Sequence, residues 1–333
     1  MGVKALRKIQ IGLEATAGMA VPATTIWRGT GTIEDQREIR RIEEDVGVLQ
    51  RTNRSATPKL LAALSMDAVA ATFEQLPYIL EAGVKQVNTG AADGAGSGLI
   101  YAYTMPTTAA NTLATYTIEG GDDQQAEEIE YAHVQSFVIA GEGADLVTMS
   151  AQWVGRQVAL CSFTTGQVIP TVEEILFGKT TLSIDAAAAM GTTPKAGTLL
   201  GFELNVANTG TRQKWFADAF GAYFSSIVTV PAEATLALTF EHDGSAVAEK
   251  AAAVAETPRA IRLSINGSLL TTAGTTYTYK TLQIDAWGKW DPFSKIDERE
   301  GNDIVTGTLQ LAYDETDSKM LEITVVNQLA SLA

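Results

Sequence analysis

The chain has 333 residues, a formal net charge of −15 at pH 7, and 46% hydrophobic and 19% charged residues. This is the composition of a globular protein, and the length exceeds the usual size of a single core, so we expect two domains. The acidic balance argues against a surface that grips DNA, because such a surface needs Lys and Arg at the phosphates.

The N-terminal 49 residues carry the most distinctive pattern. Lys8–Leu13 predicts a strand, Glu14–Gly18 a turn, and Thr24–Gly31 a β-rich run. Nine of the twelve residues from Glu34 to Asp45 are charged. Apolar residues punctuate this charged stretch, so it is neither a plain solvated helix nor a disordered acidic tail; they are Ile33, Ile39, Ile42, Val46 and Val48.

Two strand–helix pairs follow, one in each half. A strand at Leu64–Phe73 leads into a helix at Glu74–Gly83, and a strand at Ala234–Glu241 leads into a helix at Ser245–Glu256. In both halves a "TFE" strand end precedes the helix, and further strands come after it. These strands are Leu99–Met105, Ala114–Glu119, His133–Ala140, Leu146–Val158, Ala260–Ser268, Tyr277–Trp287, Ile304–Tyr313 and Met320–Val326.

The expected fold is mainly β, with one flanking helix per unit and an internal duplication. The units are residues 1–166 and 167–333, joined by a linker at Thr165–Pro170. Clean alternation of apolar and polar residues, as in Ile261–Leu269, predicts sheets with one buried and one wet face.

No catalytic or metal-binding motif is found. The only histidines, His133 and His242, have no motif around them, and Cys161 is the only cysteine, which we interpret as a buried small hydrophobe. The glycine cluster Gly90–Gly98 lacks a phosphate-loop lysine and is interpreted as a flexible surface loop. We therefore expect no enzyme activity, cofactor or metal.

An acidic stretch, Glu119–Glu130, leaves alternatives open. It holds six carboxylates and no basic residue. A solvated hairpin loop is the main interpretation. A loop facing a neighbouring molecule and a calcium site are the alternatives, although the spacing of a calcium loop is missing.

The five tryptophans raise a different function: a non-enzymatic binding or decoration module that recognises glycans on a surface. The best patch for this would be Trp287–Phe293. The competing interpretation is that the tryptophans pack a sheet or a subunit interface.

Residues 8–83 resemble the N-terminus of the major tail tube proteins of long-tailed bacteriophages. The resemblance rests on "IGLEATAG" at 11–18, "VGVLQRTNRSATP" at 46–58 and "ATFEQLPYILEAGV" at 71–84. It weakens after Gly90 and returns in "LLGFELNVANTGTRQKWF" at 199–216 and "GTLQLAYDETDSKMLEITVVN" at 307–327.

The resemblance implies a β-sandwich or small barrel core whose sheets join edge to edge into rings. Stacked rings form a tube that guides viral DNA into the host without binding it specifically. It further implies assembly in the host cytoplasm, residence in the virion tail, and contacts with a tape measure protein and with terminator or baseplate proteins. By the same resemblance, a duplicated chain favours rings of three copies with pseudo-six-fold symmetry over rings of six copies.

The sequence itself predicts no membrane span, because no apolar run of about eighteen residues is present.

Two charged segments are the candidate contacts between rings: Glu34–Asp45 and Asp291–Asp303, proposed to form long loops or hairpins that are counterparts in the two halves. The candidate interface residues are Trp27, Arg28, Glu34, Asp35, Arg37, Glu38, Arg40, Arg41, Glu43, Glu44, Asp45, Asp291, Lys295, Asp297, Glu298, Arg299, Glu300 and Asp303. A charge run is more often simply a solvated face, and that alternative stays open.

Overall fold

The computed structural model describes residues 2–187, 189–217 and 221–332. The chain is mainly β, with 49% of residues in strands and 8% in helices. This confirms the predicted class. In the described part of the chain, antiparallel pairings connect most strands into three sheets, and a cluster of buried apolar side chains runs through them.

Sheet I is formed entirely by the first half of the chain. Its strand order is β2-β1-β9-β10-β12, with bounds Thr25–Trp27, Lys8–Leu13, Tyr116–Gly121, Ala126–Glu142 and Val158–Cys161. Only the first part of β10 belongs to it.

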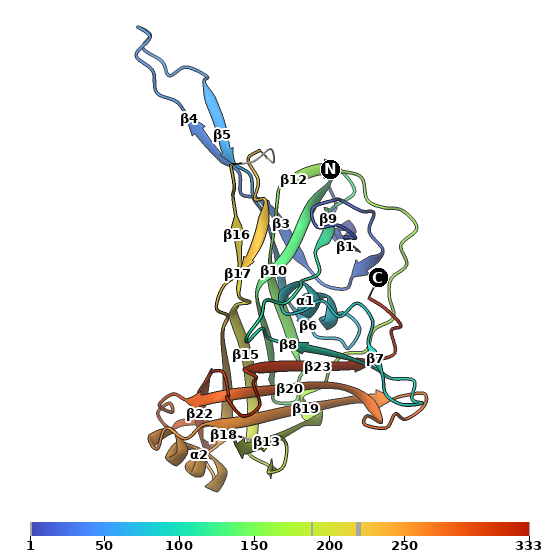
Figure 1. Cartoon of the computed structure of the whole chain (residues 1–333), viewed down its shortest axis with the longest axis vertical. Helices are drawn as coiled ribbons and strands as arrows, with labels where there is room; N and C mark the ends of the chain where they lie inside the picture. The colour runs from blue at the N-terminus through green and yellow to red at the C-terminus, as the bar shows by residue number, and fades with distance from the viewer. Residues whose placement is uncertain (1, 188, 218–220, 333) are drawn as a thin grey trace.

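Sheet II runs along the long axis of the molecule and combines both halves (Figure 1). Its order is β3-β6-β11-β10-β15-β18-β22-β21. The bounds not yet given are Gly31–Asp35, Ala62–Ala70, Thr148–Gly155, Leu199–Asn208, Glu233–Glu241, Asn302–Leu311 and Asp297–Arg299.

Sheet III crosses the lower part of sheet II in Figure 1, and the last residues of β20 pair with β22. Its order is β14-β13-β19-β20-β23-β8-β7. The bounds are Pro194–Lys195, Thr180–Ala186, Arg259–Leu269, Tyr279–Trp290, Leu321–Asn327, Leu99–Thr104 and Ala91–Ala92.

Two helices and two separate hairpins complete the fold. Helix α1 (Leu76–Gly83) is buried along its whole length, and α2 (Gly244–Val254) begins at Asp243, whose carboxylate accepts two backbone N–H groups. The hairpins are β4–β5 (Glu38–Arg41 and Ser55–Lys59) and β16–β17 (Thr211–Lys214 and Ser226–Thr229).

The same order of pairings occurs twice along the chain. In the first half β2-β1-β9-β10 continues through β11 and β6 to β3, and β12 also pairs with β10. In the second half β14-β13-β19-β20 continues through β22 and β18 to β15, and β23 also pairs with β20. Each helix follows the matching strand, β6 or β18. That this correspondence reflects a duplication stays a prediction.

The matching pairings correct one expectation. The segment Asp291–Asp303 joins β20 to β22, the position that the β10–β11 turn has in the first half. The element matching the charged stretch Glu34–Asp45 is instead the β16–β17 hairpin, because it lies between β15 and β18 as β4–β5 lies between β3 and β6. Both charged segments follow β runs, so sequence order alone suggested the wrong pair.

The halves are not independently packed. The second part of β10 pairs directly with β15, so sheet II crosses from one half to the other. Lys280 adds an ionic link, since its Nζ lies 2.6 Å from Glu74 and 3.1 Å from Glu173. The predicted linker lies within 162–173, a stretch without helix or strand between the two halves.

Glu14, in the predicted N-terminal turn, holds the bend where β10 passes from sheet I to sheet II. Its buried carboxylate accepts the backbone N–H groups of Gly18 at 2.7 Å and Tyr131 at 2.8 Å, and the hydroxyls of Thr115 and Thr117. Tyr131 has φ 55°, a conformation that is unfavourable for a residue with a side chain. The carboxylate thus compensates for local strain in β10.

We expect Glu14→Ala to lower the free energy of unfolding by about 3 kcal/mol, because it leaves several buried donors without an acceptor. Denaturant unfolding of the variant and of the wild type measures this difference. Glu127→Ala, on an accessible part of β10, is the control and should change stability by less than about 0.5 kcal/mol. Equal stability of Glu14→Ala and the wild type would contradict the assigned role.

Candidate assembly surfaces

The charged stretch of the first half forms an arm that projects from one end of the molecule (Figure 1). We define the arm as residues 36–59. Strands β4 and β5 pair at its base, and no residue from 34 to 60 is buried. A two-stranded ribbon of this kind has little stability by itself in water.

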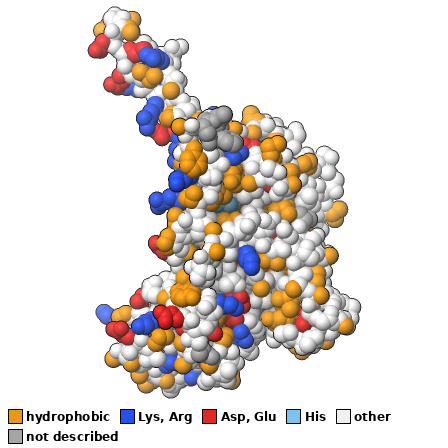
Figure 2. Space-filling view, in the orientation of Figure 1, with side chains coloured by type: hydrophobic (Ala, Val, Ile, Leu, Met, Phe, Trp, Pro, Cys, Tyr) orange, Lys and Arg blue, Asp and Glu red, His pale blue; other side chains and the backbone are white. Residues whose placement is uncertain are grey.

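The end of the arm is apolar. Val46 is 55% exposed, Val48 62%, and Leu49 is fully exposed. Ile39 on β4 is also exposed. Figure 2 shows that the arm carries hydrophobic side chains among side chains of both charges. Grouped apolar side chains at a surface usually mark an interaction site, because their exposure to water is unfavourable.

Ion pairs within the arm connect charges of opposite sign. Arg40 Nε lies 2.9 Å from Glu38, Arg51 lies 2.8 Å from Glu43, and Arg54 pairs with Glu44. Arg54 and Thr52 hold the pKa of the Glu44 carboxyl below its ordinary value. Exposed pairs of this kind contribute about 0–1 kcal/mol each, so they shape the arm more than they stabilise it.

The base of the arm rests on the matching hairpin. Lys59 Nζ lies 4.8 Å from the centre of the Trp215 ring, and the Leu60 N–H donates to the Ala222 carbonyl at 2.9 Å. Trp215 is 39% exposed. The two hairpins therefore lie at the same end of the molecule.

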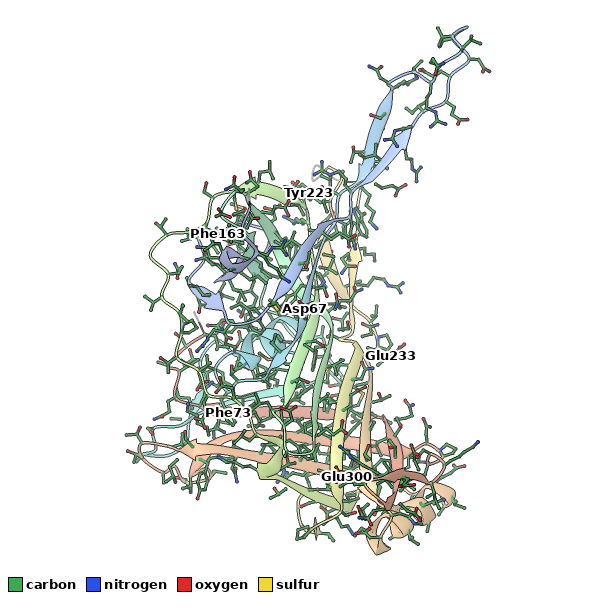
Figure 3. The ribbon with its side chains drawn as sticks, turned by 180° about the vertical axis from the view of Figure 1, so that it is seen from behind. Asp67, Phe73, Phe163, Tyr223, Glu233 and Glu300 are labelled. Atoms are coloured by element: carbon green, nitrogen blue, oxygen red, sulfur yellow. The ribbon has the colours of Figure 1, made fainter. Side chains whose placement is uncertain are left out.

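The second charged segment is short and lies at the opposite end of the long axis, where Figure 3 labels Glu300. Residues 291–296 run beside β22, and β21 then forms a tight hairpin with it. Arg299 Nη1 lies 2.7 Å from Glu142. The predicted interface residues of this segment are all accessible; they are Asp291, Lys295, Asp297, Glu298, Arg299, Glu300 and Asp303.

Most predicted residues of the first segment are also accessible. Glu34 and Asp35 lie on β3, and Arg37, Glu38, Arg40, Arg41, Glu43, Glu44 and Asp45 lie on the arm. Arg28 is exposed beside β2. Trp27 is a correction: it is 3% exposed and belongs to the core, so its side chain does not lie at the surface. It pairs with Ile9 of β1, and both side chains belong to the buried apolar cluster.

The face of sheet II opposite the core is polar but poor in positive charge. Its side chains are mainly Ser, Thr, Asn, Gln and Ala, and Glu34, Glu142 and Glu203 supply carboxylates. At the described positions of this face, strands β3, β6, β10, β11, β15, β18 and β22 carry no Lys or Arg, and Arg299 of β21 is paired with Glu142. A hollow of about 1090 Å³ lies on this face, between Ala140, Glu203, Thr239 and Arg299.

The tryptophans do not form the platform that glycan binding would need. Four are buried, since Trp27, Trp153, Trp287 and Trp290 are 1–6% exposed. The Trp290 ring packs against Phe240 and Phe293 in the core. The patch Trp287–Phe293 is therefore part of sheet packing, as the competing interpretation stated.

The residues considered for chemistry have structural surroundings. His133 is fully buried, with its Nε2 3.0 Å from Gln213 Nε2. Cys161 is partly exposed, which corrects its interpretation as a buried residue, and burial with nearby glutamates raises its pKa to about 11. No group of three or more His, Cys, Asp or Glu side chains with metal-binding geometry occurs among the described residues.

Burial lowers the pKa of His133 from 6.5 to about 4. The unfolded chain therefore binds a proton near pH 6.5 that the folded chain binds only near pH 4, so stability falls as the pH falls through this range. We expect His133→Gln to reduce the stability lost between pH 7 and pH 5 by about 2 kcal/mol. Urea unfolding at both pH values tests this, and equal losses in the two proteins would contradict it.

The glycine cluster and the acidic stretch are both tied into the fold. Asp93, buried inside Gly90–Gly98, accepts the backbone N–H groups of Thr276 and Tyr277, so this segment is anchored to the β19–β20 connection. Glu119–Glu130 forms the β9–β10 hairpin, which confirms the hairpin shape of its main interpretation, but the stretch is exposed only at its turn, residues 123–125. Glu119 is buried and accepts the Thr164 N–H at 2.7 Å.

No family model and no curated protein matches this chain. Within the described ranges, neither helix has the length and apolar character needed to cross a membrane.

Proposed function

We propose that the chain is a structural subunit that assembles with copies of itself into stacked rings, forming the tail tube of a bacteriophage. The observation that carries this proposal is the arm. It projects along the direction in which sheet II runs, has no buried residue, and ends in exposed Val46, Val48 and Leu49. A ring placed with its axis along this direction would extend each arm to the next ring.

The polar face of sheet II suits the inner wall of such a tube. A wall with few positive charges does not hold the phosphate backbone of DNA, which must slide through. Glutamates on this face repel phosphates weakly at physiological salt, since screening acts within about 8 Å. Viral DNA would then pass through without specific binding.

The two matching sets of pairings favour rings of three chains over rings of six. Each chain would contribute two similar units, giving pseudo-six-fold symmetry, and a closed ring leaves no sheet edge open. The tube would reside in the virion tail after assembly in the host cytoplasm. A tape measure protein and terminator or baseplate proteins are the further partners that the resemblance implies.

Electron microscopy of the concentrated protein tests the proposal. Rings and tubes of constant diameter are expected. A protein that stays monomeric at every concentration, and binds glycans instead, would contradict the proposed function.

A further inference from the structure

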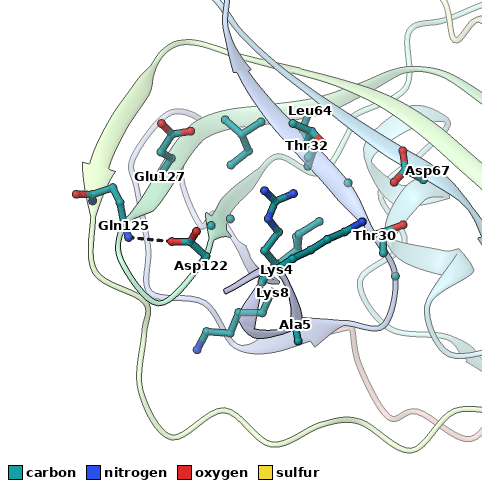
Figure 4. A pocket seen from close by; sticks show the side chains of 17 residues that line it. Lys4, Ala5, Lys8, Thr30, Thr32, Leu64, Asp67, Asp122, Gln125 and Glu127 are labelled. Carbon is teal, nitrogen blue, oxygen red and sulfur yellow. Dashed lines mark hydrogen bonds between the residues drawn. The ribbon is translucent and has the colours of Figure 1, made fainter. Parts of the chain in front are cut away.

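Within residues 2–187, 189–217 and 221–332, sheet II ends in two strand edges that pair on one side only. Strand β3 pairs with β6 on one side only. Its other side borders a hollow of about 830 Å³, also lined by Lys4, Lys8 and Glu127 (Figure 4). At the opposite end of the sheet, residues 291–299 pair with β22 on one side only.

A junction inside the chain shows how two units of this kind pair. Strand β10 of the first half lies antiparallel to β15 of the second, with Ile139 opposite Leu204 and Val138 opposite Asn205. In the repeated order of pairings, β15 has the position of β3. The end of β20 and residues 291–299 lie beside β22, so together they have the position of the second part of β10, which lies beside β11. The two open edges are therefore the counterparts of the two strands that already pair inside the chain.

The register of the open edges follows from rows of residues that lie directly opposite one another on neighbouring strands. In the first half, one such row is Ile33, Leu64, Trp153 and Val134. The corresponding row in the second half is Leu204, Leu236, Leu309 and Trp290. Ile33 thus matches Leu204.

The same rows give the residue of the other edge that corresponds to Ile139. Ile139 lies opposite Met149, which is four residues before Trp153 on β11. Because Trp153 corresponds to Leu309, Met149 corresponds to Val305, four residues before Leu309 on β22. Extending the pairing of Asp297 with Ile304 by one residue places Ile296 opposite Val305. Ile296 therefore matches Ile139.

The side chains at the open edges agree with this register. Ile139 and Leu204 are fully buried where they meet, whereas Ile296 is 52% exposed and Ile33 is half-buried. One residue further along, Glu34 and Lys295 match Asn205 and Val138, and both are exposed. A second copy would thus cover two isoleucines and pair two opposite charges.

We propose that β3 of one copy pairs antiparallel with residues 293–298 of a second copy, placing Ile33 opposite Ile296 and Glu34 opposite Lys295. This rests on the proposed function and identifies the surface through which the rings close. Opposed residues in such a pair have Cα atoms about 4.5–5.5 Å apart, close enough for a disulfide.

Cysteine cross-linking tests the pairing in the full chain. The variant carries Ile33→Cys and Ile296→Cys, with Cys161→Ala to remove the native thiol. Mild oxidation is expected to give linked dimers and trimers, which a reducing agent converts to single chains. In the control, Thr32→Cys replaces Ile33→Cys and faces the other side of the sheet, so it should cross-link about tenfold less.

A charge exchange tests the register without cysteine. Glu34→Lys and Lys295→Glu should each raise the concentration needed for assembly about fivefold, and the double variant should restore it. Rings without cross-links and without this rescue would overturn the pairing and leave the proposed function standing. Absence of both rings and cross-links would overturn both.

Discussion

The double substitution Arg40→Glu and Arg41→Glu, which reverses both charges, is expected to abolish tube growth while the fold stays intact. The two residues lie on β4 in the arm, where no side chain is buried. The reversal changes the local charge by four units, enough to turn attraction across a ring contact into repulsion. Within the chain it removes the exposed pair of Arg40 with Glu38, which contributes about 0–1 kcal/mol.

Sedimentation and electron microscopy measure tube growth, and circular dichroism with thermal unfolding measures the fold. The matched control is Arg40→Lys with Arg41→Lys, which keeps the charge and should still form tubes. Tubes of normal length from the reversed variant would show that this part of the arm does not join rings.

The second large effect is expected at Trp153. Its side chain is 1% exposed, its Nε1 lies 3.1 Å from the Met66 sulfur, and its ring meets Tyr116 edge to face at 5.9 Å. Tyr116 belongs to sheet I, so Trp153 packs sheet II against sheet I. Trp153→Ala should lower the free energy of unfolding by about 3–5 kcal/mol, through lost burial and the cavity left behind.

That loss is a large fraction of the stability of a typical domain, about 5–15 kcal/mol. Unfolding monitored by far-ultraviolet circular dichroism tests it. Trp215→Ala, at an exposed tryptophan, is the control and should lower stability by no more than about 1 kcal/mol. Similar losses for the two variants would contradict the packing role of Trp153.

Local sequence signals predicted the elements well because apolar alternation and helix ends act over short distances. Lys8–Leu13 is the observed β1, and the strand–helix pairs at α1 and α2 lie within a few residues of their predicted bounds. Strands β13 to β17, which lie between Thr180 and Thr229, were not predicted. The arm was expected as a long loop or hairpin, and the β4–β5 hairpin confirms that shape.

The sequence could not predict the long-range pairings. That β10 joins β15, and β8 joins β23, depends on contacts between distant segments. The burial of four tryptophans also depends on register, since a shift of one residue would turn each to the opposite face. For the same reason, only the pairings show which hairpin of the second half lies at the position that the arm has in the first half.

The most direct test of the assembly is a cryo-electron microscopy reconstruction of the tubes. We predict rings of three chains, an inner wall formed by the polar face of sheet II, and arms that cross from each ring to the next. An inner wall formed by another surface, or arms that contact only their own ring, would contradict the account.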